Sequence, residues 1–287
     1  MKGAHYLLLV VMAAIWGAAW TIGKLLSVSL PPFSLGVVRY AIVVPCFFML
    51  LFMREKTVGI EKKWLKSLFY MALFSVGIYQ ALFFIGVRYT GAGDAAIIIT
   101  ASPVITSFLS SILLKEKLTK NKMAGIALCV LGVLAISSVS GFSFQGKALG
   151  DILIFLAALF FSLYTIVLRK FSVSTESSPL RTMSWVSLFG LAMMLPFAFF
   201  ENPLSYSWGP GAWMEIIYLA IFSTVLGYLL YAEGVAKLGA SRTAIFMNLV
   251  PVFAAISSNL LLGEVIGFSH LAGFALIFIG VALVNRK

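Results

Sequence analysis

Three residues near the amino terminus combine two kinds of chemistry at a regular spacing. Trp16, Trp20 and Lys24 recur every four residues, so they share one face if this stretch is helical. An ammonium group can bind a carboxylate, and a tryptophan ring can stack on the body of the same small molecule. The spacing therefore predicts part of a binding site for a small molecule that carries a carboxylate.

Lys24 and Arg39 are charged residues inside otherwise apolar stretches. A charge held in hydrocarbon costs several kcal/mol unless its side chain reaches the headgroups or finds a partner. Two interpretations are open for each residue: it extends to the outer headgroups, or it receives a substrate carboxylate. Aligning residues 16–17 with residues 161–162 also sets Arg169 opposite Lys24, which predicts one cation at each mouth of a pathway.

Residues that could catalyse a reaction or hold a metal are sparse and scattered. The chain has two histidines, His5 and His270, and two cysteines, Cys46 and Cys129, without metal-ligand or disulfide spacing. The phosphate-binding pattern GxxxxGK(S/T) is absent, so ATP does not drive the protein directly. These observations argue against an enzyme and predict no metal and no cofactor.

The composition indicates the medium in which these residues lie. Of the 287 residues, 61% are hydrophobic and only 11% are charged, and the mean hydropathy is +1.05. Soluble domains are about half apolar and about a quarter charged, so a core packed in water could not bury this chain. The net charge of +11 resides between the apolar stretches, which is typical of membrane topology and argues against nucleic-acid binding.

Ten apolar segments are each long enough, at about 20 residues, to span a bilayer as a helix. They cover roughly residues 5–26, 33–53, 66–88, 94–114, 122–140, 149–170, 179–200, 213–235, 242–262 and 268–285. The first segment continues past Trp20 to Leu26, which favours a membrane span over a cleaved signal peptide. The predicted fold class is an all-α integral membrane protein with ten transmembrane helices.

Lysine and arginine residues assign the two sides of the membrane. With the amino terminus inside, the inward segments carry 17 of them and the outward segments carry two, Arg88 and Lys147. Basic residues concentrate on the cytoplasmic side of membrane proteins. The distribution predicts a multi-pass protein of the cell (inner or plasma) membrane with both termini in the cytoplasm.

The chain also contains an internal repeat. A shift of 148 residues aligns residues 86–133 with residues 234–281 without a gap, and 18 of the 48 aligned positions are identical. The identical pairs include Gly86/Gly234, Gly91/Gly239, Pro103/Pro251, Glu116/Glu264, Gly125/Gly273 and Gly132/Gly280. Aligned glycine, proline and glutamate do not arise by chance from apolar composition, so the match predicts a duplicated unit of five helices.

Because five is odd, the second unit enters the membrane from the opposite side. Lys115 at the end of the fourth span becomes Gly263 at the end of the ninth, as expected if these two ends face opposite sides. We therefore predict a first repeat over residues 1–140, an outer linker over 141–147 and an inverted second repeat over 148–287. Inverted repeats are typical of secondary transporters.

Specific motifs extend this pattern to a known family. Trp-Gly stands at residues 16–17, and in each copy a proline is followed thirteen residues later by glutamate, most clearly over residues 237–264. With its ten spans, the whole chain resembles the EamA-type branch of the drug/metabolite transporter superfamily. The resemblance implies a substrate cavity bordered by the first, third, fourth, sixth, eighth and ninth spans. That family moves amino acids, other small metabolites and drugs, so the resemblance does not identify the substrate.

Two prolines lie near the middle of the fourth and ninth predicted spans. Pro103 and Pro251 each remove one helical hydrogen bond and kink the helix, so the pair predicts two hinges. Thr100 and Asn248 lie three residues earlier in each copy. Their side chains either bind substrate near the membrane midplane or satisfy the backbone groups that the prolines release.

Aromatic residues in several spans complete the predicted cavity, although such stripes serve equally well as core or lipid-facing packing. The predicted substrate-binding set is Trp16, Trp20, Lys24, Arg39, Tyr79, Phe83, Thr100, Tyr164, Tyr228, Tyr231 and Asn248. Gln80 lies beside Tyr79 in the third span. Glu233 precedes Lys237 by one turn, which predicts an ion pair, and Glu233 is also the candidate residue for proton coupling.

Carboxylates and glycines at the helix ends predict scaffold contacts. Glu116 and Glu264 end their helices, where the dipole disfavours an anion, so a helix N-terminus or a basic residue must compensate. Asp94 begins the fourth span, where a carboxylate suits the helix dipole. Small residues seven apart predict close contact between the fifth and tenth spans: Gly125, Gly132, Gly273 and Gly280.

Taken together, the residues predict a secondary active or facilitative transporter that exports small organic metabolites, with amino acids favoured, by alternating access. Export of lipophilic cationic drugs is the alternative, although the spans carry no membrane-buried carboxylate apart from Glu233. A membrane channel is the alternative from another class. The expected partners are a small-molecule substrate and the lipid bilayer, without nucleic acid, and the protein is either a monomer or a homodimer.

Overall fold

The computed structural model describes residues 2–89, 98–99, 101–137, 148–201, 208–263 and 267–285, and every regular element in these ranges is a helix. Seven helical stretches are long and apolar enough to cross a bilayer, beside the shorter apolar helices Ala101–Leu113 and His270–Val284. The chain is therefore a multi-pass helical membrane protein. The predicted all-helical class is confirmed for this part of the chain, whereas the count of ten spans remains a prediction.

Each predicted apolar segment overlaps a helix or a run of consecutive helices. The uninterrupted helices are α1 (Lys2–Ser29), α2 (Pro32–Glu55), α6 (Ala101–Leu113), α7 (Lys120–Ser137), α8 (Ala148–Ser174), α9 (Pro179–Phe200) and α14 (Phe268–Asn285). Proline opens α2 and α9, where its missing N–H costs no hydrogen bond. The Ser178 hydroxyl caps α9 by accepting a bond from the Arg181 N–H at 3.0 Å.

The remaining helical stretches change geometry along their length. The segments are η1 (Lys62–Trp64), α3 (Leu65–Ala72), η2 (Leu73–Ile78) and α4 (Tyr79–Tyr89); α10 (Pro210–Tyr218), η5 (Leu219–Leu226) and α11 (Gly227–Leu238); and α12 (Ala240–Ala244), η6 (Ile245–Leu249) and α13 (Val250–Leu262). Both η2 and η5 are π-helical, and they overlap when the 148-residue offset is extended to them. A π turn loosens the regular hydrogen-bond ladder, and such turns are frequent at functional sites.

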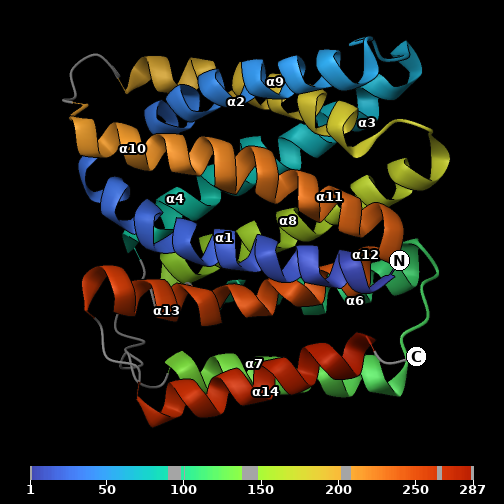
Figure 1. The fold of residues 1–287 in the computed structure, drawn as a ribbon, viewed down its shortest axis with the longest axis vertical. Helices are drawn as coiled ribbons and strands as arrows, with labels where there is room; N and C mark the ends of the chain where they lie inside the picture. The colour runs from blue at the N-terminus through green and yellow to red at the C-terminus, as the bar shows by residue number, and fades with distance from the viewer. Residues whose placement is uncertain are drawn as a thin grey trace.

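The helices pack side by side into one bundle (Figure 1). The α2 helix lies along α9 at one edge of the bundle, and α7 lies along α14 at the opposite edge. Between these pairs, α1 packs against α11 and α13, and α4 and α6 pack against α8. Helices from the early and late parts of the chain are thus in contact throughout the bundle.

Glycines allow α7 and α14 to approach closely. A Cβ atom added to Gly125 would lie 2.6 Å from the carbonyl oxygen of Gly280, and one added to Gly132 would lie 2.6 Å from that of Gly273. Real Cβ atoms essentially never approach this closely, and a Cβ atom added to Gly280 would likewise lie 2.6 Å from the carbonyl oxygen of Gly125, so Gly125, Gly132 and Gly280 depend on the small residue. The predicted contact between these two helices is confirmed.

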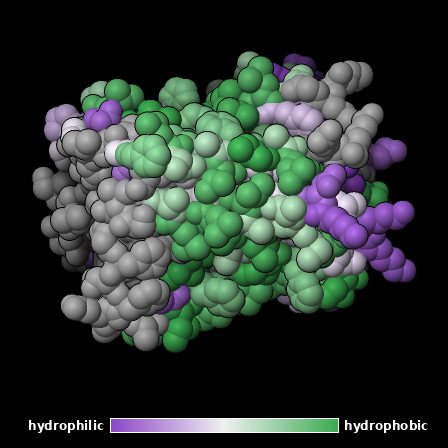
Figure 2. Space-filling model, turned by 90° about the horizontal axis from the view of Figure 1, so that it is seen from below, coloured by the Kyte–Doolittle hydropathy of each residue, from purple (hydrophilic) through white to green (hydrophobic). Residues whose placement is uncertain are grey.

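Large apolar side chains cover much of the outside of the bundle. Phe200 is 86% exposed, Phe268 is 85% exposed and Leu260 is 77% exposed. Figure 2 shows hydrophobic side chains across the middle of the face that it presents and hydrophilic side chains gathered at one end. In water such a surface would aggregate, whereas in a bilayer it contacts the lipid chains.

Candidate functional site

Rings from four helices meet in the interior of the bundle. Trp16 of α1 contacts Phe161 of α8 and Tyr228 of α11, with ring centroids 6.3 and 5.3 Å apart. Phe161 also contacts Tyr79 of α4 at 5.3 Å. We call the following set the aromatic cluster: Trp16, Tyr79, Phe161, Tyr164, Tyr228 and Tyr231. It gathers five of the residues that the sequence placed in the binding site.

The deepest members of the aromatic cluster are held in position by hydrogen bonds. Tyr164 and Tyr231 are fully buried. The Tyr231 hydroxyl shares a 2.8 Å hydrogen bond with the Thr165 hydroxyl, and the Tyr164 hydroxyl donates to the sulfur of Met183 at 3.6 Å. Because buried hydroxyls without partners are costly, these bonds fix the orientation of both rings.

Trp16 is anchored to the π-helical segment of the second half. Its indole N–H donates to the carbonyl oxygen of Ser223 in η5 at 2.9 Å. A Cβ atom added to Gly227 would lie 2.3 Å from the indole nitrogen, so only glycine leaves room for this ring. The π turn, the glycine and the tryptophan therefore act together to place the ring.

Gly17, the next residue, brings α1 against α13. A Cβ atom added to Gly17 would lie 2.5 Å from the Cβ of Phe253 and 2.7 Å from the backbone nitrogen of Ala254. One turn further along α1, the Thr21 hydroxyl shares a 2.7 Å hydrogen bond with the Ser257 hydroxyl. The Trp-Gly motif thus connects α1 to two helices of the second half, with Trp16 on one side and Gly17 on the other.

Trp20 and Phe83 extend the aromatic cluster along α1 and α4. Their ring centroids are 5.1 Å apart in an edge-to-face arrangement, and Phe83 stacks on Tyr79 at 5.9 Å. Both Trp20 and Phe83 are half-buried. The predicted face of α1 is therefore aromatic at Trp16 and Trp20, whereas the Lys24 side chain lies outside the described part of the structure.

Arg39 of α2 is a buried cation close to the aromatic cluster. Only 9% of its surface is exposed, and its guanidinium donates to the side-chain oxygen of Gln80 at 2.5 Å. The Gln80 amide nitrogen in turn donates to the Tyr40 hydroxyl at 3.1 Å. The prediction that Arg39 extends to the headgroups does not describe this conformation, because the side chain points into the bundle.

A narrow crevice lies beside the same glutamine, and it has no room for a water molecule. It is lined by Pro32, Phe33, Val76, Gln80, Ala81 and Met194. These residues come from α2, η2, α4 and α9. Gln80 therefore lies between a buried guanidinium and this narrow crevice; the sequence grouped it with Tyr79 and Phe83 as a candidate cavity residue without placing it in the predicted binding set.

The two prolines both lie within helical stretches. Pro251 is the second residue of α13, directly after the 3₁₀ segment η6, and Pro103 lies in α6, with residues 98–99 before it also helical. A 3₁₀ turn preceding Pro251 gives the change of helix geometry expected at a hinge. Asn248 of η6 is buried, and its side-chain oxygen has no hydrogen-bond partner among the described residues. Thr100 lies outside the described residues.

The predicted ion pair between Glu233 and Lys237 is wrong. The ion pairs of 4.0 Å or less in the described part of the chain do not include it. Lys237 is exposed, and Glu233 is half-buried. A spacing of four residues brings two side chains to one helix face, but it does not by itself form an ion pair, because solvent-exposed ion pairs contribute little to the free energy of folding.

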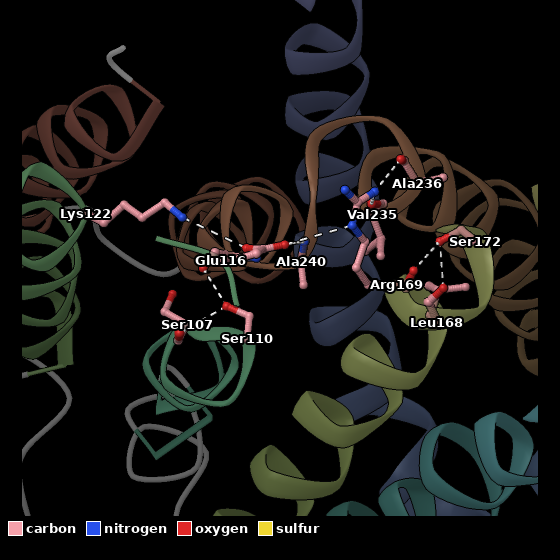
Figure 3. Close-up of polar contacts among 11 residues, drawn as sticks. Ser107, Ser110, Glu116, Lys122, Leu168, Arg169, Ser172, Val235, Ala236 and Ala240 are labelled. Atoms are coloured by element: carbon pink, nitrogen blue, oxygen red, sulfur yellow. Dashed lines mark hydrogen bonds and ion pairs between the residues drawn. The ribbon is translucent and has the colours of Figure 1, made fainter. Parts of the chain in front are cut away.

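Glu116 links four helices at one end of the bundle (Figure 3). Its carboxylate accepts hydrogen bonds from the backbone N–H groups of Ala240 at 3.1 Å and Ser241 at 3.3 Å. It also lies 4.0 Å from the ammonium of Lys122 and 3.9 Å from the guanidinium of Arg169. The expectation that a helix N-terminus or a basic residue compensates this carboxylate is confirmed, and both do. Glu264 and Asp94 lie outside the described residues.

Arg169 belongs to the same contact. Its guanidinium donates to the carbonyl oxygens of Val235 and Ala236 at 3.1 and 2.6 Å, at the C-terminal end of α11 (Figure 3). The side chain therefore joins α8 to α11 and to Glu116. In this conformation Arg169 is engaged by protein groups, so the sequence prediction of a free cation at a pathway mouth does not describe it.

Two further carboxylates connect the ends of α2 to the ends of α9. The sequence analysis did not predict these contacts. Glu55 at the end of α2 accepts a hydrogen bond from the Ser178 hydroxyl and lies 2.7 Å from the Arg181 guanidinium, at the start of α9. Glu201 at the end of α9 accepts from the Ser34 N–H at 2.7 Å and from its hydroxyl at 3.0 Å, at the start of α2. Each helix of this antiparallel pair is thus fastened at both ends.

Phe161 and Gln80 were missing from the predicted site. For Phe161 a signal existed, because residues 161–162 align with the Trp-Gly motif and so place this ring opposite Trp16. For Gln80 the sequence offered only its position beside Tyr79. Its role depends on Arg39, which lies 41 residues away along the chain.

Comparison with known proteins agrees with these observations. The model of the EamA-like transporter family matches residues 3–138 and again residues 148–286. The chain is 33% identical to the uncharacterized transporter YetK of Bacillus subtilis, covering 98% of this chain and 87% of that protein. It is 31% identical to the uncharacterized transporter YyaM of the same organism, covering 96% and 92%. One solved crystal structure has the same fold, with a TM-score of 0.78 at 16% identity and coverage of 99% and 96%.

Proposed function

The chain belongs to the EamA-like transporter family and is a membrane transporter, and we propose that it is a secondary or facilitative carrier that exports small organic metabolites, with amino acids the favoured class. The observation that carries this proposal is the aromatic cluster, which joins α1 and α4 to α8 and α11 in the bundle interior. Binding sites for small molecules are largely apolar and aromatic, with a few placed polar groups. Buried Arg39 and Gln80 supply such groups beside the rings.

Alternating access between two inverted five-helix repeats is the proposed mechanism. We assign the repeats to residues 1–140 and 148–287, with residues 141–147 as the linker. Three paired features support this assignment: the two π segments, the glycine contact between α7 and α14, and the reciprocal carboxylate clamps of α2 and α9. Two related halves can exchange roles and so open a central site to either side in turn.

We further propose that the protein resides in the cell membrane with both termini in the cytoplasm, which labelling can test. Lys115→Cys and Gly263→Cys are suitable reporters because both positions are exposed, and Cys46 and Cys129 can be replaced by alanine beforehand. In intact cells an impermeant maleimide is expected to label position 263 and to reach position 115 only after permeabilisation. Labelling of both positions from the same side would contradict the inverted repeat.

The transport function itself is tested by counterflow in proteoliposomes with a panel of amino acids and lipophilic cations. A carrier is expected to show saturable uptake that accelerates when the vesicles are preloaded with unlabelled substrate. A channel would show neither saturation at low concentration nor counterflow. Liposomes with a heat-inactivated sample of the protein provide the control, and flux equal to that control for every compound would contradict the proposal.

A further inference from the structure

Arg39 is a cation that the described part of the protein leaves without a counter-ion. It is 91% buried, as follows from its exposed fraction of 9%. No carboxylate of the described residues lies within 4.0 Å of its guanidinium, whereas Arg169 and Arg181 each have one. A buried charge without a partner is unfavourable in a membrane protein and marks a functional site.

The guanidinium is also incompletely hydrogen-bonded. One terminal nitrogen donates to Gln80, but the Nε atom is buried without a hydrogen-bond partner. The Gln80 side chain is held in turn by Tyr40, so it orients the guanidinium and leaves the Nε donor available. A guanidinium in this condition fits a planar oxyanion, which accepts two parallel N–H bonds from adjacent donors.

The surroundings of Arg39 define the rest of a ligand. Its guanidinium lies 5.3 Å from the centre of the Tyr40 ring, and the Gln80 side chain that it contacts comes directly after Tyr79 in α4. Tyr79 belongs to the aromatic cluster, in which its ring contacts Phe161. A carboxylate on Arg39 would therefore carry an aromatic body toward the rings.

From these contacts we propose that Arg39 binds the carboxylate of the transported molecule and that the carrier prefers aromatic monoanions to zwitterions and cations. The inference rests on the proposed transport function, and it narrows the substrate class from amino acids in general to aromatic carboxylates, of which those without an ammonium group are preferred. A monoanion neutralises the buried guanidinium. A zwitterion also brings an ammonium group, for which the described residues around Arg39 offer no carboxylate, and a cation is repelled.

Three compounds with the same aromatic ring and different charge test the preference: phenylacetate, phenylalanine and phenethylamine. Binding is measured by thermal stabilisation in detergent, and transport is measured by counterflow. The wild-type protein is expected to bind phenylacetate most tightly and phenethylamine most weakly. Stabilisation by phenylalanine or phenethylamine that equals or exceeds stabilisation by phenylacetate would overturn the inference, whereas counterflow of any of the three compounds would still support a carrier.

Substitution of the arginine gives the second arm of the test. Arg39→Gln is expected to weaken phenylacetate binding at least about tenfold, because a charge-assisted hydrogen-bonded pair is lost. Arg39→Lys keeps the positive charge but lacks the planar guanidinium that donates two parallel hydrogen bonds, so it should give an intermediate loss of phenylacetate affinity. Arg54→Gln is the matched control, since Arg54 lies on the same helix and is exposed. Equal phenylacetate affinity in Arg39→Gln and Arg54→Gln would overturn the inference.

Asp94 lies outside the described residues, so double variants test whether its carboxylate is a counter-ion of Arg39. If it neutralised Arg39 permanently, Arg39→Gln and Asp94→Asn would each lower the thermal midpoint, and the double variant would recover it. The double variant would then bind phenylacetate as the wild-type protein does. That combination of results would also overturn the inference, whereas loss of binding in Arg39→Gln at an unchanged midpoint is the result expected.

Discussion

Gly17→Val is expected to abolish transport and to reduce sharply the yield of folded protein. The new Cβ atom would lie 2.5 Å from the Cβ of Phe253 and 2.7 Å from the backbone of Ala254. Because backbone atoms cannot rotate away as a flexible side chain can, α1 would have to move from α13. Overpacking of this kind costs about 3 kcal/mol or more. The displacement would also carry Trp16 away from Ser223 and open the aromatic cluster.

The same substitution at Gly23 provides the control for this prediction. Gly23 lies on α1 as well, but a Cβ atom added there meets nothing within 4 Å. Both variants gain the same β-branched side chain in a helix, so their intrinsic helix propensities change equally. Size-exclusion profiles, thermal midpoints and counterflow rates should separate them clearly. Similar behaviour of Gly17→Val and Gly23→Val would show that the close approach of α1 and α13 is not required.

Glu116→Gln is expected to loosen the end of the bundle at which α6, α7, α8 and α12 meet. The substitution removes the negative charge that faces Lys122 and Arg169, while one amide oxygen remains to accept a backbone hydrogen bond. The carboxylate is only partly shielded, with 19% of the side chain exposed, so the cost is about 1–3 kcal/mol. The thermal midpoint in detergent should fall by roughly 2–8 °C.

An accessibility measurement distinguishes loosening of this end from general destabilisation. Ala240 is fully buried under Glu116, so a cysteine at position 240 should react slowly with a maleimide in the parent protein and faster in the Glu116→Gln background. Glu176→Gln is the control, because Glu176 is exposed and takes part in none of the ion pairs found among the described residues. Unchanged reactivity at position 240 would contradict a closing role for Glu116.

If alternating access operates, Glu116 holds one of its closed ends. The carboxylate connects α6 and α7 of the first half to α8 and α12 of the second, so opening at this end has to break these contacts. Opposite charges that separate during opening favour the closed state until substrate binding compensates for them. The accessibility of position 240 would then report the equilibrium between closed and open forms at this end.

The helix boundaries were predictable because they depend on local properties of the chain. The length of each apolar run, the prolines at Pro32 and Pro179 and the basic gaps predicted segments that agree with the helices to within a few residues, for example 179–200 for α9 and 268–285 for α14. The glycine contact of α7 and α14 was predictable for the same reason, since seven-residue spacing defines one helix face. Neither inference required knowledge of distant partners.

The partners of individual polar side chains were not predictable in this way. Glu233 and Lys237 have the ion-pair spacing and do not pair, whereas Arg169 bonds to carbonyl groups 66 and 67 residues away. Arg39 turns toward Gln80 although extension to the headgroups was equally consistent with its position. In each case several partners were compatible with the local sequence, and packing in three dimensions selected one.

The sequence by itself determined that this protein is a helical membrane protein and where its apolar helices begin and end, because hydrophobic length is readable one segment at a time. Its repeated motifs predict two related halves. The tertiary structure alone decided which side chains share a site. Trp16 reaches Ser223 across 207 residues, and a π turn with Gly227 makes room for it. Such contacts arise from the relative placement of whole helices, which no local pattern encodes.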